Sequence, residues 1–232
     1  MPLPAELLAA VSNKGGGRLV VVIGAGCSFD PPTSVPLSRQ CSLNANRQLV
    51  ADGVLQNGQC DSPQDLSRLA DVVFAVTGGQ AQLVARLPIG LFRNAAPNDG
   101  HLLAAALLRE RAVGAVMTLN FDLAMSHALA QLGAGDDVGT VRGPADLAGQ
   151  RLVNLVYLHR NVDADPEQWV LRSAVLAGDW KGQWEELITT TVLASPWFTD
   201  RQLLYEAARR LVRFPGCNDR DQPNGTANTK SP

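Results

Sequence analysis

Residues 19–28 read LVVVIGAGCS, an apolar run that ends in two glycines and a serine. Aliphatic residues without polar alternation are typical of a parallel strand that is buried on both faces. Gly24 and Gly26 allow positive φ, and they let the main chain approach an anion because no Cβ stands in the way. Ser28 adds a hydroxyl donor. The stretch therefore predicts a strand that leads into a phosphate-binding turn, with a tight turn that binds nothing as the alternative.

The turn departs from the usual dinucleotide-binding fingerprint at one position. That fingerprint has a third glycine three residues after the second, and Phe29 occupies this position here. The difference counts against an ordinary flavin or nicotinamide oxidoreductase loop and favours a wider turn. A stiff loop follows over residues 30–36, where three prolines fix φ and remove hydrogen-bond donors. Such a loop is suited to cover a ligand.

Composition limits the classes of function. With 232 residues, of which 46% are hydrophobic, the chain is long enough to bury one good core. The net charge is −2 and the basic residues are scattered, which argues against nucleic acid. No apolar run has the length of a membrane span, and the N-terminal sequence lacks the features of a signal peptide, so we expect a cytoplasmic protein. The four cysteines form no CxxC pair, which argues against a zinc site and a disulfide framework.

The order of the expected elements predicts the fold class. Strands are expected at 19–23, 113–119 and 152–158, with a short fourth strand at 169–171. Helices are expected at 4–12, 38–49, 63–76, 80–87, 98–111, 121–132, 184–193 and 201–212. This alternation favours an α/β fold with a doubly wound, mostly parallel, Rossmann-like sheet, helices on both faces and no zinc module. We expect one domain over residues 1–214 and a disordered polar tail over 215–232.

A second group of polar residues follows the strand expected at 113–119. Thr118, Asn120 and Asp122 alternate with apolar residues, so an extended backbone would point the three polar side chains the same way. Ligands of open α/β sheets bind beyond the carboxyl ends of the strands. We therefore expect these residues at a ligand site, with capping of the next helix by Asn120 or Asp122 as the alternative.

Histidine is scarce in this chain, with three residues in all. His159 alone comes at the end of an expected strand, so it should lie at the same sheet edge as the other two sites. There it could act as a general base near neutral pH. His101 opens an apolar helix and His127 lies among alanines and leucines. We expect both of these to be structural or surface residues.

Together the three motifs resemble the sirtuin family and its shorter, zinc-free bacterial relatives. The resemblance covers residues 18–171, keeps the order of the motifs and is more specific than any single motif. The GAGxS turn, the TxNxD element and the LH pair of that family are matched by Gly24, Ala25, Gly26, Ser28, Thr118, Asn120, Asp122, Leu158 and His159. A looser match to the family's GIPDFR loop keeps Pro36 and Arg39.

The resemblance implies chemistry on NAD, at the bond between nicotinamide and ribose. Asn120 would orient water or the ribose, Asp122 would hold the nicotinamide end, and His159 would be the base. The glycine turn would hold the diphosphate. The cofactor-binding residues would be Gly24, Ala25, Gly26, Ser28, Pro36, Arg39 and Thr118.

Three features differ from the family pattern. Arg160 replaces the glycine that follows the histidine, where it could crowd the site or bind a phosphate. Asp30 brings a carboxylate near the expected diphosphate, which costs binding energy unless the side chain turns away. The family's later GTS-type strand, which supports the adenosine half of the cofactor, is not found in the sequence.

The resemblance leads to three candidate functions, in order of preference. The first is an NAD glycohydrolase that releases nicotinamide and ADP-ribose, as in sirtuin-like effectors of bacterial antiphage defence, with NAD as its substrate. The second is an NAD-dependent protein deacylase, which the lack of a four-cysteine zinc module disfavours. The third is a non-catalytic module that binds NAD or ADP-ribose. A homo-oligomer and a complex with a partner defence protein both stay open.

Overall fold

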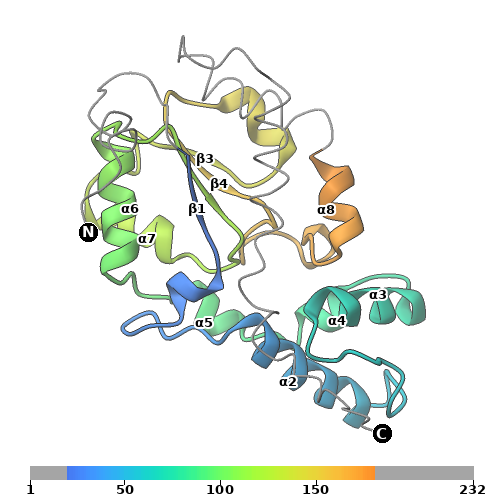
Figure 1. The fold of residues 1–232 in the computed structure, drawn as a ribbon. Coiled ribbons are helices and arrows are strands. Elements are labelled where there is room, and N and C mark those ends of the chain that lie inside the picture. Colours follow the sequence, from blue (N-terminus) through green and yellow to red (C-terminus); the bar gives the residue numbers. More distant parts are fainter. Residues whose placement is uncertain (1–19, 181–232) are drawn as a thin grey trace, which may run out of the picture. The chain divides into compact units, whose positions relative to one another are not determined.

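The computed structural model describes residues 20–180. Its centre is a sheet of four parallel strands in the order β1-β2-β4-β3 (Figure 1). The strands are β1 (Val20–Ile23), β2 (Ala115–Thr118), β3 (Gly139–Val141) and β4 (Asn154–Tyr157). Ile23 is paired with Thr118, and Thr118 with Tyr157, so β1, β2 and β4 end at the same level. The residues that follow these three strands are therefore neighbours in space.

Helices cover both faces of this sheet, as the sequence predicts. On one face lie α6 (Asp99–Arg109) and α7 (Ala124–Gln131) (Figure 1). The core beneath them contains alternate residues of the strands, among them Val116, Leu155 and Tyr157. Alternate residues share a face because successive side chains of a strand point to opposite sides.

The second face is covered by shorter elements. These are the 3-10 helix η2 (Pro144–Gly149) and helix α8 (Ser173–Asp179), which contribute Leu147 and Leu176. The buried residues of this core are Met117, Val141, Val156, Leu158 and Trp180. The indole Nε1 of Trp180 donates a hydrogen bond of 3.0 Å to the carbonyl of Leu158. This bond holds the end of α8 against the end of β4.

A separate group of helices comes between β1 and α6. Its members are α2 (Ser38–Ala51), α3 (Leu66–Thr77), α4 (Ala81–Val84) and α5 (Ile89–Arg93). Asp65 caps α3 by accepting from two main-chain N–H groups, and Gly78 ends the same helix in the left-handed conformation. The group has a core of its own, to which Trp169 and Leu171 also belong. The 3-10 helix η3 (Pro166–Gln168) directly precedes these two residues.

The structure corrects the predicted elements in several places. Residues 169–171 form no strand, because their apolar side chains pack into the core of the helical group. The fourth strand is β3, which the sequence prediction missed. The helix predicted at 80–87 ends at Val84, after which the chain tightens into i→i+3 hydrogen bonds before Pro88. Strand β1 is less buried than predicted: Val22 is 36% exposed, and β1 lies at the edge of the four described strands.

Other predicted segments lie outside the described residues. They are the helices at 4–12, 184–193 and 201–212, the domain boundary at 214 and the tail at 215–232. Within residues 20–180, the helices are all too short or too polar to cross a membrane.

Candidate functional site

The turn after β1 is a 3-10 helix, η1 (Ala25–Ser28). The φ of Gly24 is −126°, and neither Gly24 nor Gly26 adopts a positive φ, so the conformational freedom expected of them is not used. The glycines provide space instead, because a Cβ built at either position meets no atom within 4 Å. The main chain of the turn therefore borders open space, as the close approach of a ligand requires.

Asn120 joins the end of β2 to this turn. Its side-chain Nδ2 donates to the carbonyl of Gly24 at 3.1 Å and to Oγ of Ser28 at 2.9 Å. Asn120 is 6% exposed and Ser28 is fully buried, so both bonds are shielded from water. The parallel pairing of β1 with β2 makes this contact possible, because it brings together two segments about ninety residues apart. The first two motifs of the sequence thus meet at one place.

The other two polar residues of the second motif are bonded locally. Oγ1 of Thr118 accepts from the main-chain N–H of Asn120 at 3.0 Å. Oδ1 of Asp122 accepts from the N–H of Ala124 at 3.1 Å, at the start of α7. The N-cap residue of α7 is Leu123 and has no side-chain cap, so this bond is a local turn rather than the expected cap, and it occupies only one of the two carboxylate oxygens of Asp122. Asn120 and Asp122 both line the cavity described next.

A small cavity of about 60 Å³ lies between the ends of β1 and β2 and the helical group. Three polar residues of the first two sequence motifs line it, namely Ser28, Asn120 and Asp122. Its other lining residues are Ala25, Val35, Pro36, Ser38, Cys41, Leu66, Leu87, Phe92, Leu119 and Phe121. Sites for whole small-molecule ligands have volumes of about 300–1,000 Å³. This cavity can therefore take one end of a ligand, while the rest would extend over the open side of the turn.

Of the remaining residues of the predicted cofactor site, some line the small cavity and one does not. Ala25 and Pro36 line the small cavity. Arg39 is exposed on α2 and is not among the residues that line it. Asp30, the carboxylate expected to disfavour a diphosphate, is also exposed, so water can screen its charge. Burial raises the pKa of the Cys27 thiol, and the charge of Asp122 raises it further, so this thiol is not activated.

His159 lies at the end of β4 but is turned away from the small cavity. Its Nδ1 donates to the carbonyl of Val170. His159 lines neither of the two cavities that the described residues form. The ring of Phe121, which does line the small cavity, has its centroid 5.8 Å from that of His159. Burial lowers the pKa of His159, the hydrogen bond to Val170 opposes this, and the charge of Arg160 adds to it. The imidazole is therefore neutral near pH 7, with its lone pair on Nε2.

His101 is the residue that the sequence reasoning missed. It was expected to be structural or to lie at the surface, and it is structural, because it is buried in the first turn of α6 and forms a capping box with Asn98. What was not foreseen is that its Nε2 lies 3.2 Å from Oγ of Ser28. A helix that follows one parallel strand and precedes the next begins at the carboxyl edge of the sheet. A side chain in the first turn of α6 therefore reaches the same edge as Ser28, and this placement is the signal that could have found His101.

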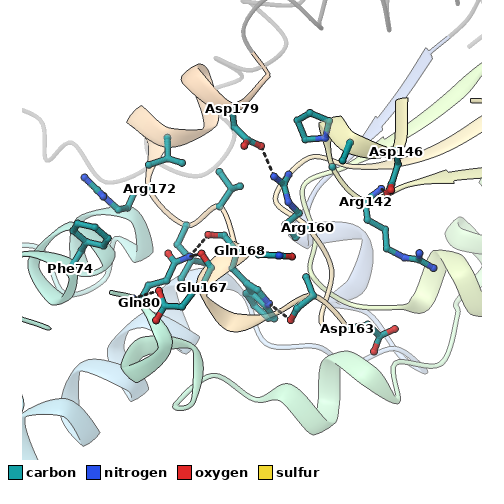
Figure 2. Close-up of a pocket in the computed structure, with 18 residues that line it drawn as sticks. Phe74, Gln80, Arg142, Asp146, Arg160, Asp163, Glu167, Gln168, Arg172 and Asp179 are labelled. Carbon is teal, nitrogen blue, oxygen red and sulfur yellow. Dashed lines mark hydrogen bonds and ion pairs between the residues drawn. The ribbon is translucent and has the colours of Figure 1, made fainter. Parts of the chain in front are cut away.

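A second cavity, of about 670 Å³, lies beyond the ends of β3 and β4 (Figure 2). The residues that line it come from η2, η3, α8, the loops between them and the helical group, which contributes Phe74 and Gln80, and they carry charges of both signs. Figure 2 shows the guanidinium of Arg160 turned toward Asp179, to which it is paired at 2.8 Å. Arg160 therefore does not crowd the small cavity, as its place after His159 had suggested. No sequence motif marks this cavity, because loops form most of its wall.

The side chain of Arg160 is held by close packing as well as by charge. Its φ is +72°, a value that side-chain-bearing residues rarely adopt, and its guanidinium lies against Gly143. A Cβ built at Gly143 would be 2.9 Å from Cζ of Arg160. Nearby, Arg172 is paired with Asp71 at 2.7 Å. These ion pairs occupy much of the positive charge around the large cavity.

Comparison with known proteins gives no family for this chain. No protein-family model matches it, and no curated protein matches it either. What the described residues define is an α/β protein with a parallel sheet, consistent with a Rossmann-like fold. Among residues 20–180, no cluster of three or more His, Cys, Asp or Glu side chains is placed to hold a metal ion.

Proposed function

We propose that this protein binds NAD and hydrolyses the bond between nicotinamide and ribose, releasing nicotinamide and ADP-ribose. The observation that carries the proposal is the position of Asn120, whose amide bridges the carbonyl of Gly24 and the hydroxyl of Ser28. It joins a glycine turn with an open main-chain side to a small cavity that contains a carboxylate. These two parts suit an anionic group and a flat, polar-ended ring on the same ligand.

The small cavity suits the nicotinamide end. Phe92, Leu119 and Phe121 provide an apolar lining for a flat ring, and the carboxylate of Asp122 can accept from a carboxamide. The diphosphate would then lie over η1, where Gly24 and Gly26 leave the main chain uncovered. The adenosine half has no assigned place among the described residues.

The polar groups of the cavity suit the charge that develops in this reaction. As nicotinamide leaves with the electrons of its bond to C1′, the ribose becomes an oxocarbenium-like cation, which the carboxylate of Asp122 and the amide oxygen of Asn120 would stabilise. Water then attacks C1′, and its proton passes to a base. The base proposed is His159, whose lone pair is on Nε2 because Nδ1 donates to the carbonyl of Val170. Since His159 does not line the cavity, the proton would reach it through one intervening water.

The test is incubation of the purified protein with NAD, with nicotinamide and ADP-ribose measured by chromatography. We expect both products in equal amounts, and we expect Asn120→Ala and His159→Ala each to abolish their release while the protein stays folded. His127→Ala is the matched control, because it removes a histidine that bonds to the carbonyl of Ala95 and lines neither cavity. Turnover that survives either site substitution would show that the site is wrongly assigned.

One observation favours a second candidate, a module that binds NAD or ADP-ribose without cleaving it. His159 does not line the small cavity, so no imidazole described here faces a ligand in it directly. A binding module predicts that NAD and ADP-ribose both raise the melting temperature while no nicotinamide is released. Release of nicotinamide would rule this candidate out.

A further inference from the structure

Four side chains behind the small cavity form one continuous chain of hydrogen bonds. Nδ1 of His101 lies 2.7 Å from Oδ1 of Asn98, and Nε2 of His101 lies 3.2 Å from Oγ of Ser28. Oγ of Ser28 also accepts from Nδ2 of Asn120 at 2.9 Å. Ser28, His101 and Asn120 are buried. Water therefore does not compete with these bonds, which strengthens them.

Main-chain carbonyl groups fix both ends of the chain. Nδ2 of Asn98 donates to the carbonyl of Cys27 at 2.7 Å, and Nδ2 of Asn120 donates to the carbonyl of Gly24 at 3.1 Å. Oδ1 of Asn98 is therefore the atom that faces His101, and it requires a proton on Nδ1. The main-chain N–H of Asn98 forms the other half of the capping box by donating to Nδ1 at 3.4 Å, which would require Nδ1 to accept. The shorter contact determines the tautomer. Without a proton on Nδ1, lone pairs on Nδ1 and on Oδ1 of Asn98 would face each other at 2.7 Å.

The direction of the remaining bonds follows from that proton. A neutral imidazole with its proton on Nδ1 can only accept at Nε2, so the hydroxyl of Ser28 donates to His101. Burial lowers the pKa of His101, and the charge of Asp122 opposes this shift, so the imidazole is neutral near pH 7. The oxygen of Ser28 is then free to accept from Asn120. The hydrogen bonds therefore all point the same way, from Asn120 through Ser28 and His101 to Asn98.

This direction determines how the amide of Asn120 is turned. Its Nδ2 carries two hydrogens, and both are used, one on the carbonyl of Gly24 and one on Ser28. Oδ1 is left as the atom of the amide that serves the cavity, which Asn120 lines. An acceptor there can hold a hydrogen of water or of a ribose hydroxyl, and it favours positive charge. A flipped amide would present a donor and disfavour that charge.

We propose that His101 is a positioning residue, which acts through Ser28 to keep Oδ1 of Asn120 directed at the small cavity. The inference rests on the proposed function, in which Asn120 faces the reacting carbon. In this scheme His101 touches neither NAD nor water. Its loss should therefore lower kcat, because the amide is misplaced, and leave KM almost unchanged.

The kinetic test uses three variants of the full chain. His101→Leu removes both bonds of the imidazole, while His101→Gln keeps an amide oxygen that can accept from Ser28. We expect His101→Leu to lower kcat for NAD cleavage about 100-fold, the effect of misplacing a reacting group by about 1 Å, with KM within about threefold of wild type. His101→Gln should restore part of kcat. His127→Leu, the control on α7, should leave kcat unchanged, and an unchanged kcat in His101→Leu would overturn the proposal.

A spectroscopic test needs neither a variant at position 101 nor enzymatic activity. The protein is labelled with ¹⁵N-histidine, and the ring nitrogens are assigned with the help of His127→Leu and His159→Ala, which leave those of His101. We expect His101 to be neutral, with its proton on Nδ1. A proton on Nε2 would reverse the chain and refute the proposal, whether or not the protein cleaves NAD. If wild type releases no nicotinamide while this tautomer is found, the proposed function fails and the hydrogen-bond chain stands.

Discussion

Replacing Gly26 by valine separates the folding role of the glycine turn from its binding role. A Cβ at Gly26 meets no atom within 4 Å, and φ at this position is not positive, so valine enters open space without backbone strain. A substitution of glycine at such a position restricts the unfolded chain, and we expect the free energy of unfolding to stay within about 1 kcal/mol of wild type. A ligand diphosphate at the turn would, by contrast, meet the branched side chain.

The size of the effect on binding can be worked out. NAD at about 100 times its Kd stabilises the native state by about 2.7 kcal/mol, which raises the melting temperature by about 5–11 °C for a chain of this size. If valine weakens binding about 100-fold, the same NAD concentration contributes only about 0.4 kcal/mol, or about 1–2 °C. Without NAD, the two proteins should melt within a few degrees of each other.

The assay is a thermal-shift titration with NAD, with Gly149→Val as the matched control. Gly149 also belongs to a 3-10 helix, has open space at its Cβ, and lines neither cavity. We expect the control to keep the full NAD-dependent shift and Gly26→Val to lose most of it. An equal shift in Gly26→Val and wild type would refute the phosphate-binding role of the turn. No shift in wild type would refute NAD binding itself.

Two further predictions concern stability. Gly143→Ala should lower the free energy of unfolding in urea by up to about 1 kcal/mol, because its Cβ would lie 2.9 Å from the guanidinium carbon of Arg160 and push that flexible side chain from its ion pair with Asp179; a value equal to that of Gly149→Ala would contradict this packing. Burial lowers the pKa of both His101 and His159 below 6.5, so the unfolded chain binds protons that the native state does not. Stability should be full above pH 6.5 and fall as the pH drops below it, and replacing both histidines by glutamine should flatten this dependence.

The fold was predictable where apolar runs were long enough to carry a signal. The strands predicted at 113–119 and 152–158 contain β2 and β4, because segments of seven mainly apolar residues suit a strand covered on both faces. Strand β3 has only three residues and begins with glycine, so no run of apolar residues indicates it in the sequence. Residues 169–171 are as apolar as a short strand, and only the tertiary packing of Trp169 against Phe121, with ring centroids 4.6 Å apart, shows what they do.

The candidate site was predictable as far as topology determines it. The rule that ligands bind beyond the carboxyl ends of parallel strands places Ser28 and Asn120 together, and the structure shows them bonded. The rule says nothing of where a side chain points, so it could not show that His159 turns to the carbonyl of Val170. His101 has no local feature that marks it in an alanine- and leucine-rich helix, and only its place in the first turn of α6, at the same edge of the sheet, could have indicated it.

The η1 turn is clamped from two sides, by Asn120 at the carbonyl of Gly24 and by Asn98 at the carbonyl of Cys27. Ordering a flexible residue costs about 1–2 kcal/mol in backbone entropy. A turn held in this way has lost that freedom on folding, before any ligand arrives. An anion that binds here meets a preorganised surface, and its affinity is not reduced by an entropic cost of shaping the turn.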